Sequence, residues 1–353
     1  MIRVLVVDDS VVIRRLVTQT LERDPDITVV GTAADGRLAL AKVAQLDPDV
    51  VTLDIEMPRM NGIETVAALR AAGRQVPVIM FSTLTERGAA ATLDALTAGA
   101  TDYVTKPSGT GSMATALERV GVELVPKIKA LVPQGTRPAA TARPAGGRAV
   151  QTARRTSPVK PVRAVVVGSS TGGPEALRRV LSELDARLPV PMLVVQHMPP
   201  VFTRQLAERL DRVGPTTVVE AAGNEPLLPG HAYLAPGGRH LEVVGQGAGV
   251  RTLLTDGPPV NFTRPAVDVL FRSAVRVLGG DLLALVLTGM GSDGRDGAGE
   301  IARAGGHVLA QDEQTSVVWG MPGAVTTAGH AHQVLPVGTI AQALAAATSG
   351  TRP

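Results

Sequence analysis

The stretch VVTLDIEMPRMNGIETVAALR, residues 50–70, decides the fold of the first third of the chain. An apolar run at 50–53 leads into Asp54 and a short loop, and an amphipathic segment then covers 62–72. This alternation occurs five times before residue 106, with the other apolar runs at 4–7, 29–33, 78–81 and 103–104. Continuous apolar strands joined by amphipathic helices are typical of a parallel sheet with both faces covered. We therefore predict an α/β domain over residues 1–125.

Polar residues stand at the carboxyl ends of four of these predicted strands: Asp8, Asp9, Asp54, Ser82 and Lys106. Functional residues of doubly wound sheets gather at this edge. Three carboxylates placed so closely repel one another unless a cation neutralises them, and Mg²⁺ suits a site built from oxygen ligands. With the metal bound, Asp54 is able to attack a phosphoryl donor and form an acyl phosphate. Lys106 and the Ser82 hydroxyl would then bind the new phosphate oxygens.

Three segments of this domain resemble the motifs of bacterial response-regulator receivers: VVDDS (6–10), LDIEMPRMNG (53–62) and TDYVTKP (101–107). The resemblance implies a (βα)5 flavodoxin-like fold in which Asp54 is phosphorylated. It implies a set of metal ligands, namely Asp9, Asp54, the backbone carbonyl of Glu56 and, through water, Asp8. It also implies a phosphorylation switch formed by Ser82, Tyr103 and Lys106. Any one aspartate alone would be an ordinary solvated loop residue, but the full set at four strand ends favours the receiver.

The basic residues of the chain are concentrated in one region. Nine of them, and no acidic residue, lie between Glu123 and Glu175, whereas the net charge of the whole chain is only +3. This region also holds several prolines among Ala, Gly and Thr, so it buries too little apolar surface to offset the entropy of ordering. We predict a basic linker rich in Pro, Arg and Ala over 126–160. We expect no nucleic-acid partner for it, because stacking aromatics are absent.

Composition excludes several classes of protein. At 353 residues the chain is long enough for two compact domains, and 44% hydrophobic residues with 19% charged residues are typical of globular proteins. The absence of cysteine excludes disulfides, thiolate metal sites and cysteine nucleophiles. No apolar run approaches the roughly 18 residues of a membrane span, and the early paired aspartates do not fit a signal peptide. We expect a cytoplasmic protein that does not insert into a membrane.

The α/β alternation resumes in residues 161–353. Apolar runs predict strands at 163–170, 192–196, 217–219, 282–287, 307–310 and 333–335, and amphipathic segments predict helices at 174–184, 202–213 and 263–278. The Gly- and Pro-rich region 223–259 predicts hairpins inserted on this scaffold. A helix-turn-helix DNA reader would instead need a small helical module with a basic recognition helix. We predict a doubly wound, mostly parallel α/β domain of the kind found in enzymes.

Three polar loops follow strands of this second predicted sheet. GSSTGGP, residues 168–174, places Ser170 beside a helix N-terminus, where backbone amides stabilise developing negative charge. Taken alone, the loop fits a phosphate-binding turn or a serine N-cap better than a catalytic site. However, His197 follows the second strand, and Asp293 lies in the Gly-rich turn after the strand at 282–287. We therefore expect Ser170, His197 and Asp293 to converge as nucleophile, base and orienting acid.

The order of these residues argues against one familiar class of hydrolase. Gly168-x-Ser170-x-Gly172 fits the nucleophile elbow of α/β-hydrolases, whose triad follows the order Ser, acid, His. In this chain the order is Ser, His, Asp. We therefore predict a different scaffold that carries the same three residue types.

Six segments of this half resemble the CheB family of chemotaxis response-regulator methylesterases: VVVGSSTGGPEAL (165–177), VVQHMPPVFTRQLAERL (194–210), YLAPGGRHL (233–241), RPAVDVLFRSA (264–274), LTGMGSDG (287–294) and QDEQTSVVWGMPGAV (311–325). The resemblance implies a methylesterase domain over 161–353. It gives Ser170, His197 and Asp293 the triad roles and assigns the oxyanion hole to the backbone amides of Thr171 and Met290. It implies Mg²⁺ in the receiver and no cofactor for the esterase chemistry.

The same resemblance implies a function in sensory adaptation. The implied reaction is hydrolysis of glutamate γ-methyl esters on the cytoplasmic helices of methyl-accepting chemotaxis receptors, together with deamidation of glutamines on the same receptors. A CheA-type histidine kinase would phosphorylate Asp54 and activate the enzyme, and receptor arrays at the membrane would recruit it. The sequence leaves two alternatives open. One is a phosphorylation-gated serine hydrolase of a methylated protein outside chemotaxis, and the other is a transcription factor that binds DNA through the basic linker.

Overall fold

The computed structural model describes residues 1–106, 113–132 and 161–349, so most of the predicted linker lies outside the described residues. The N-terminal domain contains, in chain order, β1 (Ile2–Val7), α1 (Val11–Leu21), β2 (Ile27–Ala33), α2 (Gly36–Leu46), β3 (Val50–Asp54), α3 (Gly62–Ala71), β4 (Val78–Ser82), α4 (Glu86–Thr97), β5 (Asp102–Thr105) and α5 (Met113–Leu131). The expected alternation of strands and helices is confirmed.

The five strands of this domain form one parallel sheet in the order β2-β1-β3-β4-β5. Each of the three central strands is buried almost throughout, as expected for a sheet covered on both faces. β3 ends at Asp54 and β4 ends at Ser82, while Asp8 and Lys106 directly follow β1 and β5. The topology therefore brings all four residues to one edge of the sheet.

Helix α5 continues to Leu131, past the boundary predicted at residue 125. Pro126 lies inside this helix, where the sequence suggested a linker. Two of the basic residues counted with the linker are engaged in ion pairs: Lys127 with Asp102 at 2.8 Å, and Lys129 with Asp24 and Asp26 at 2.9 Å. Part of the basic region therefore belongs to the N-terminal domain.

The described part of the C-terminal domain contains nine strands, which are, in chain order, β6 (Ala164–Ser169), β7 (Met192–Gln196), β8 (Thr217–Glu220), β9 (His231–Leu234), β10 (His240–Val244), β11 (Arg251–Thr255), β12 (Leu282–Val286), β13 (His307–Gln311) and β14 (Gln333–Leu335). Its helices are α6 (Gly173–Ser182), α7 (Pro200–Leu210), α8 (Val267–Leu278), α9 (Arg295–Arg303), α10 (Met321–Thr327) and α11 (Val337–Thr348), and a short 3-10 turn covers Gly247–Gly249.

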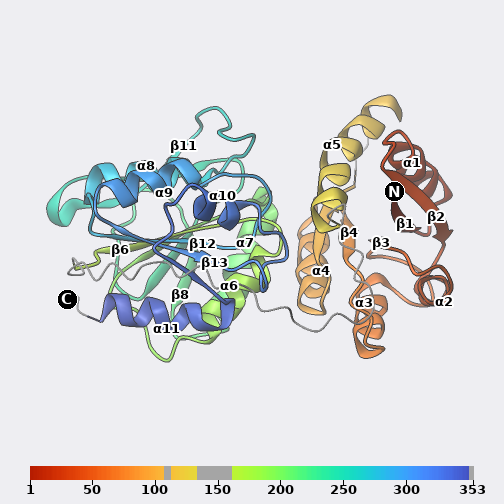
Figure 1. Cartoon of the computed structure of the whole chain (residues 1–353), viewed down its shortest axis with the longest axis horizontal. Coiled ribbons are helices and arrows are strands. Elements are labelled where there is room, and N and C mark those ends of the chain that lie inside the picture. Colours follow the sequence, from red (N-terminus) through yellow and green to blue (C-terminus); the bar gives the residue numbers. More distant parts are fainter. Residues whose placement is uncertain (107–112, 133–160, 350–353) are drawn as a thin grey trace.

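Seven of these strands form a sheet in the order β14-β13-β12-β6-β7-β9-β8, and every pairing in it is parallel. Alternate residues of β6 enter different cores: Val165 and Val167 join one apolar cluster and Val166 joins the other. Helices α6, α7 and α11 cover the first face, and α8, α9 and α10 cover the second (Figure 1). The predicted doubly wound fold is confirmed.

The region predicted as inserted hairpins has a mixed structure. β10 and β11 form the expected antiparallel hairpin. β9 instead inserts into the main sheet between β7 and β8, because its apolar residues Ala232, Tyr233 and Leu234 are buried there. The sequence did not predict β9, because the glycines and prolines on both sides of it indicate turns. A run of four residues is also too short to show a clear periodicity.

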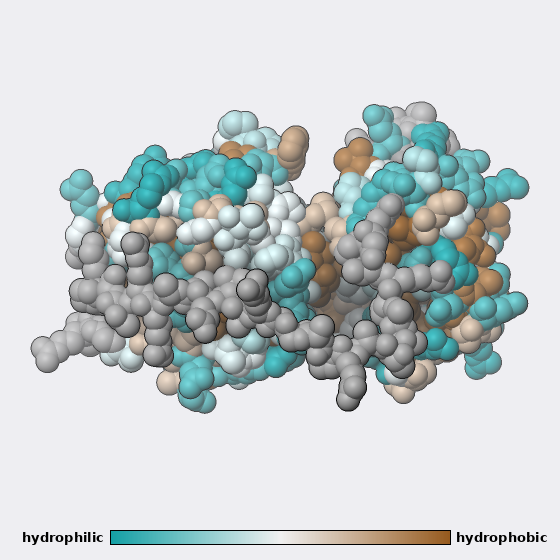
Figure 2. All heavy atoms as spheres, viewed as in Figure 1, coloured by the Kyte–Doolittle hydropathy of each residue, from teal (hydrophilic) through white to brown (hydrophobic). Residues whose placement is uncertain are grey.

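The two domains pack against each other through α4 of the first and α6 and α7 of the second (Figure 1). Tyr103 stacks on Phe202 with ring centroids 4.7 Å apart, and both side chains belong to one apolar cluster shared by the domains. Arg209 on α7 binds Asp94 at 2.8 Å and the carbonyl of Ala90 at 2.7 Å. In Figure 2 hydrophobic residues are visible where the domains face each other and also on the outer side of the N-terminal domain. No helix among the described residues is long and apolar enough to cross a membrane.

Candidate functional site

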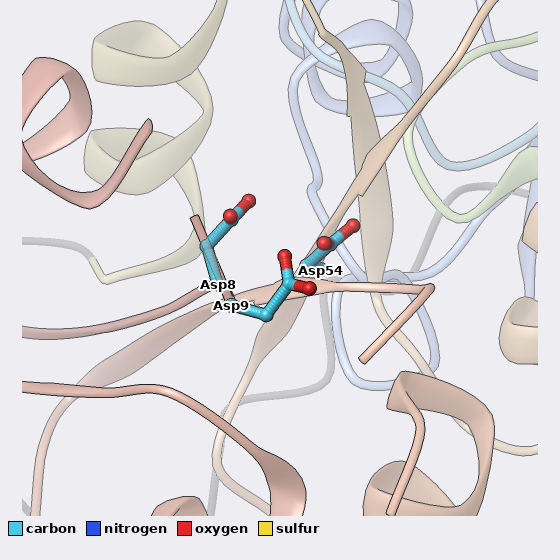
Figure 3. A group of neighbouring side chains, drawn as sticks. All are labelled: Asp8, Asp9 and Asp54. Atoms are coloured by element: carbon cyan, nitrogen blue, oxygen red, sulfur yellow. The ribbon is translucent and has the colours of Figure 1, made fainter. Parts of the chain in front are cut away.

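The first candidate site is a cluster of three carboxylates at the edge of the N-terminal sheet. Asp8, Asp9 and Asp54 each place one oxygen within 4.8 Å of the others (Figure 3). Asp8 and Asp54 are buried, whereas Asp9 is exposed. Oδ2 of Asp8 is buried and accepts no hydrogen bond, although it makes an ion pair with Lys106 at 3.0 Å. Three carboxylates gathered so closely offer only oxygen donors, which fit a hard divalent cation such as Mg²⁺.

Lys106 connects two of these carboxylates. Its Nζ lies 2.7 Å from Oδ1 of Asp54 as well as beside Asp8. Burial raises the pKa of Asp54 to about 6, even though the hydrogen bond from Lys106 opposes the shift, and the charge of Asp8 adds to it. Burial alone would lower the pKa of Lys106, but its contacts with Asp54 and Asp8 raise it overall. Lys106 therefore stays charged beside the acid cluster.

The predicted switch residues Ser82 and Tyr103 are engaged elsewhere in this structure. The Ser82 hydroxyl donates to the carbonyl of Gly88 at 3.1 Å and accepts from the Thr92 hydroxyl at 2.6 Å. Tyr103 is buried against Phe202 of the other domain. Ser82 thus contacts α4, and Tyr103 contacts the other domain. In the described part of the chain, neither side chain donates a hydrogen bond to Asp54.

The second candidate site lies at the carboxyl edge of the C-terminal sheet, where the structure brings Ser170, His197 and Asp293 together. All three line one groove of about 800 Å³. Nε2 of His197 lies 2.9 Å from Oδ2 of Asp293. This bond uses the Nε2 nitrogen, so Nδ1 is the ring nitrogen left to accept a proton from Ser170. Sequence reasoning predicted the three residues but not which nitrogen faces the acid.

Backbone hydrogen bonds hold Ser170 in position. Its amide donates to the carbonyl of Thr288 at 3.0 Å, and its carbonyl accepts from Nε2 of Gln196 at 2.9 Å. Gly289 lets the two loops approach, because a Cβ at that position would lie 2.8 Å from the Cβ of Ser170. Gln196 is a supporting residue that the sequence did not reveal, since its role depends on the register of β6 and β7.

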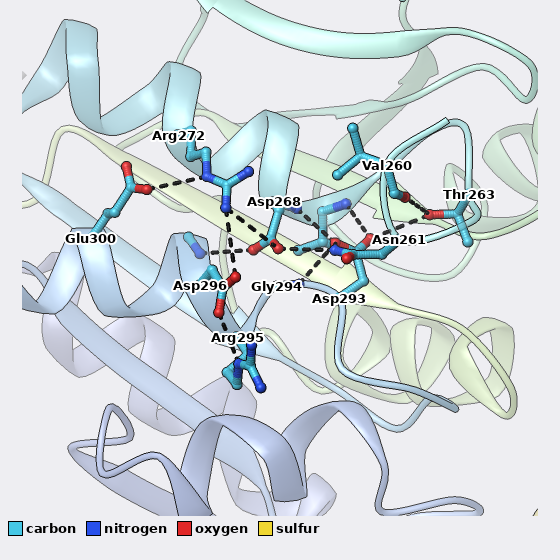
Figure 4. Close-up of polar contacts among 12 residues, drawn as sticks. Val260, Asn261, Thr263, Asp268, Arg272, Asp293, Gly294, Arg295, Asp296 and Glu300 are labelled. Atoms are coloured by element: carbon cyan, nitrogen blue, oxygen red, sulfur yellow. Dashed lines mark hydrogen bonds and ion pairs between the residues drawn. The ribbon is translucent and has the colours of Figure 1, made fainter. Parts of the chain in front are cut away.

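Asp293 is the most heavily hydrogen-bonded residue of the site (Figure 4). Its Oδ1 accepts from Asn261 Nδ2 at 2.9 Å and from the amides of Asp268 and Gly294 at 3.0 Å. Its Oδ2 accepts from the amide of Val267 at 2.6 Å as well as from His197. Burial would raise the pKa of Asp293, but these bonds, above all the one from His197, hold it below the usual value. Asp293 therefore stays ionised and keeps a proton on Nε2 of His197.

Comparison with known proteins identifies the family. Residues 165–344 match the CheB methylesterase family, and residues 4–118 match the response regulator receiver domain. A protein-glutamate methylesterase/protein-glutamine glutaminase from Nocardioides sp. is 61% identical over 342 residues, which cover 95% of this chain and 92% of the relative. The chain belongs to the CheB methylesterase family.

Two further likenesses agree with this family. A relative of the same name from Trichodesmium erythraeum is 45% identical, over 96% of this chain and 97% of its own. The crystal structure of the CheB methylesterase catalytic domain from Thermotoga maritima is 42% identical, covers 53% of this chain and 99% of that one, and superposes with a TM-score of 0.51. This CheB chain thus combines a receiver domain with a methylesterase domain.

The oxyanion hole was predicted to consist of the backbone amides of Thr171 and Met290. Both residues line the groove. Neither of their amides donates a hydrogen bond to another residue in the described part of the chain. The two amides are therefore free to bind a developing oxyanion.

The receiver domain of this CheB chain reaches into the same groove. Tyr103, Thr105, Glu123 and Lys127 contribute to its lining. The Thr171 hydroxyl, one residue from Ser170, donates to Oδ2 of Asp102 at 2.8 Å, and Lys127 binds the same oxygen. The receiver is therefore in direct contact with the loop that carries Ser170.

Proposed function

We propose that this protein is a phosphorylation-activated protein-glutamate methylesterase that acts on methylated chemotaxis receptors and also deamidates glutamines. The observation that carries the proposal is the His197–Asp293 pair in one groove with Ser170, on a chain whose relatives bear that name. Ser170, His197 and Asp293 would form the triad.

The proposed reaction begins when Oγ of Ser170 attacks the γ-carbonyl carbon of the ester. Nδ1 of His197 takes the serine proton, and the ion pair with Asp293 stabilises the imidazolium. The amides of Thr171 and Met290 would hold the oxyanion. The intermediate then collapses, the carbon–methoxy bond breaks, and His197 returns the proton so that methanol leaves.

Water completes the cycle through the same groups. His197 accepts a proton from the water as its oxygen attacks the acyl carbon, and then returns a proton to Oγ of Ser170. The products are free enzyme and a glutamate γ-carboxylic acid, which ionises in solution. With glutamine as the substrate, the leaving group of the first step is ammonia, a poorer leaving group than methanol. One triad therefore serves both substrates.

Phosphorylation of Asp54 is the proposed control. Asp9, Asp54, the Glu56 carbonyl and, through water, Asp8 would hold Mg²⁺, which would neutralise charge on the incoming phosphoryl group. Asp54 would accept that group from a CheA-type histidine kinase. Lys106, already beside Asp54, would bind a phosphate oxygen. Ser82 would have to leave Gly88 and Thr92 to reach the same phosphate.

The contacts described above suggest how this signal reaches Ser170. Tyr103 packs on Phe202, and Asp102 in the same strand binds Thr171. A shift of β5 and α4 on phosphorylation would loosen both contacts and open the groove to a receptor helix. In this proposal the receiver inhibits the esterase until Asp54 is phosphorylated.

The experiment that tests the function follows methanol release from methylated receptor preparations. We expect release by the wild-type chain and none by Ser170→Ala, with glutamate appearing in place of its ester. Release that survives Ser170→Ala would contradict the triad. If neither protein releases methanol from receptors, while a fluorophosphonate still labels Ser170, the substrate is a different methylated protein.

A further inference from the structure

A tight turn at the rim of the groove holds a residue in an unfavourable conformation. Val260 and Thr263 exchange two backbone hydrogen bonds of 3.0 Å, which close a two-residue hairpin turn. Both central residues have left-handed backbones, Asn261 with φ +52° and Phe262 with φ +65°. Such turns favour Asn followed by Gly. Asn261 suits its position, but the bulky side chain of Phe262 makes the second position strained.

Phe262 gains nothing from packing that would offset this strain. Its side chain is fully exposed, at 103% of the reference accessibility, and it is the most exposed large hydrophobic residue in the described part of the chain. The exposure is complete with the receiver domain in place. Neither the core of the methylesterase domain nor the contact with the receiver therefore explains an aromatic residue here.

The turn is rigidly joined to the catalytic acid. Nδ2 of Asn261 donates to Oδ1 of Asp293 and to Oδ2 of Asp268, both at 2.9 Å (Figure 4). The Thr263 hydroxyl also donates to the Val260 carbonyl at 3.0 Å. Phe262 thus stands between two residues whose positions are fixed, and it lines the groove that contains Ser170. An exposed aromatic side chain on a backbone held in this way is suited to anchor a protein partner.

We propose that Phe262 is a specificity-determining residue, which binds an apolar side chain next to the esterified glutamate on the substrate protein. This inference rests on the proposed function and names one contact that the substrate must offer. The groove is larger than a single esterified side chain fills, and other apolar residues, Met198, Met290 and Pro265, also line it. The enzyme should therefore prefer substrate segments in which an apolar side chain lies on the same face as the esterified glutamate.

The test compares two substrates and three variants of the full-length chain. The substrates are a methylated receptor cytoplasmic fragment and N-acetylglutamate γ-methyl ester, which has no neighbouring side chains. Phe262→Gly removes the contact and relieves the strained backbone, so it should fold at least as stably as the wild type. Phe262→Leu retains an apolar side chain. Leu253→Ala, at an exposed position of the β10–β11 hairpin, is the matched control.

We expect Phe262→Gly to lower kcat/KM on the receptor fragment about tenfold, mainly through KM, with Phe262→Leu in between. Hydrolysis of the small ester and the rate of fluorophosphonate labelling of Ser170 should match the wild type, and Leu253→Ala should match it throughout. Receptor kcat/KM within twofold of the wild type in Phe262→Gly would overturn the proposal. An equal loss in receptor hydrolysis and in fluorophosphonate labelling would overturn it too, because Phe262 would then act on the triad.

These outcomes are separate from a failure of the proposed function. If the wild-type chain does not release methanol from receptor fragments, the methylesterase proposal fails before any variant is compared. If the wild type does so and Phe262→Gly does so equally well, only the role of Phe262 is wrong.

Discussion

Asp54 illustrates how burial and function are linked at the scale of one residue. Its folded-state pKa of about 6 lies above the ordinary value of 3.8, so the folded metal-free chain holds this proton more tightly than the unfolded chain does. Folding stability is therefore lost as pH rises from about 4 to about 6, by about 3 kcal/mol at most. A bound cation would remove this cost by compensating the carboxylate charge.

Protons and Mg²⁺ should compete for the carboxylate of Asp54, and this gives the first prediction. We expect the affinity for Mg²⁺ to fall as pH drops from 7 to 5, approaching tenfold per pH unit below about 6, because a protonated Asp54 is a poor ligand. Isothermal titration calorimetry would measure it. Asp54→Asn should bind Mg²⁺ more weakly and without that dependence. A wild-type affinity that is constant from pH 7 to 5 would contradict the assignment of Asp54 as a ligand.

At this scale the sequence predicted much of both sites. Asp8, Asp9, Asp54 and the triad residues all follow or end apolar strands, so the rule that parallel strands end at one edge was sufficient. Asn261 and Gln196 could not be predicted. Asn261 lies in a loop distant in sequence from Asp293, and its contact depends on a left-handed turn whose second residue is not the usual glycine.

At the scale of elements, Asp293 also serves the N-terminus of α8. The N-cap of this helix is Ala266, which has no side chain able to accept a hydrogen bond. Asp293 accepts from the amides of Val267 and Asp268 instead. The partial positive charge of the helix N-terminus also favours an ionised carboxylate there. Asp293 is thus part of the helix cap.

The second prediction follows from this double role. Asp293→Ala should lower the free energy of unfolding by about 1–2 kcal/mol, because α8 loses its cap. It should also reduce methanol release on the order of 10⁴-fold, because His197 loses its orienting partner. Ser170→Ala is the control, with activity lost and stability nearly unchanged. Urea unfolding and methanol assays would measure the two effects, and an Asp293→Ala chain as stable as the wild type would exclude the capping role.

Elements were predicted well where apolar periodicity is strong and less well elsewhere. The strands β1, β3, β4, β6, β7 and β12 are buried runs that the sequence marks clearly. Helices α9 and α10 were not predicted, because both are short and α9 also follows a Gly-rich turn. Their apolar residues, such as Ile301 and Met321, are buried only once the sheet is assembled. Local periodicity does not contain that information.

At the scale of the molecule, the interface between domains holds the receiver over the groove. Arg209 joins α7 to α4 through Asp94 and the Ala90 carbonyl. Both α4 and β5 of the receiver therefore contact the methylesterase domain beside Ser170. The sequence predicted two domains, but not this surface, because its residues on α4 and α7 form an ordinary amphipathic pattern in each domain separately.

The third prediction concerns that contact. Arg209→Ala should raise the activity of the unphosphorylated chain about two- to fivefold, because a partly exposed ion pair contributes modestly to closure. Arg276→Ala is the matched control, since the ion pair of Arg276 with Glu242 joins α8 to β10 within the methylesterase domain. Methanol release without a phosphodonor would measure the effect. Equal activity of Arg209→Ala and the wild type would show that this ion pair does not restrain the groove.

The central claim is that Asp54 controls Ser170 within one molecule. The most direct measurement follows methanol release from methylated receptor fragments by the full-length chain, before and after a small phosphodonor and Mg²⁺ are added. We expect the phosphodonor to raise the rate of the wild type and to leave Asp54→Asn at its basal rate, while Ser170→Ala is inactive in both states. A wild-type rate that does not respond to the phosphodonor, or an equal response by Asp54→Asn, would contradict the claim.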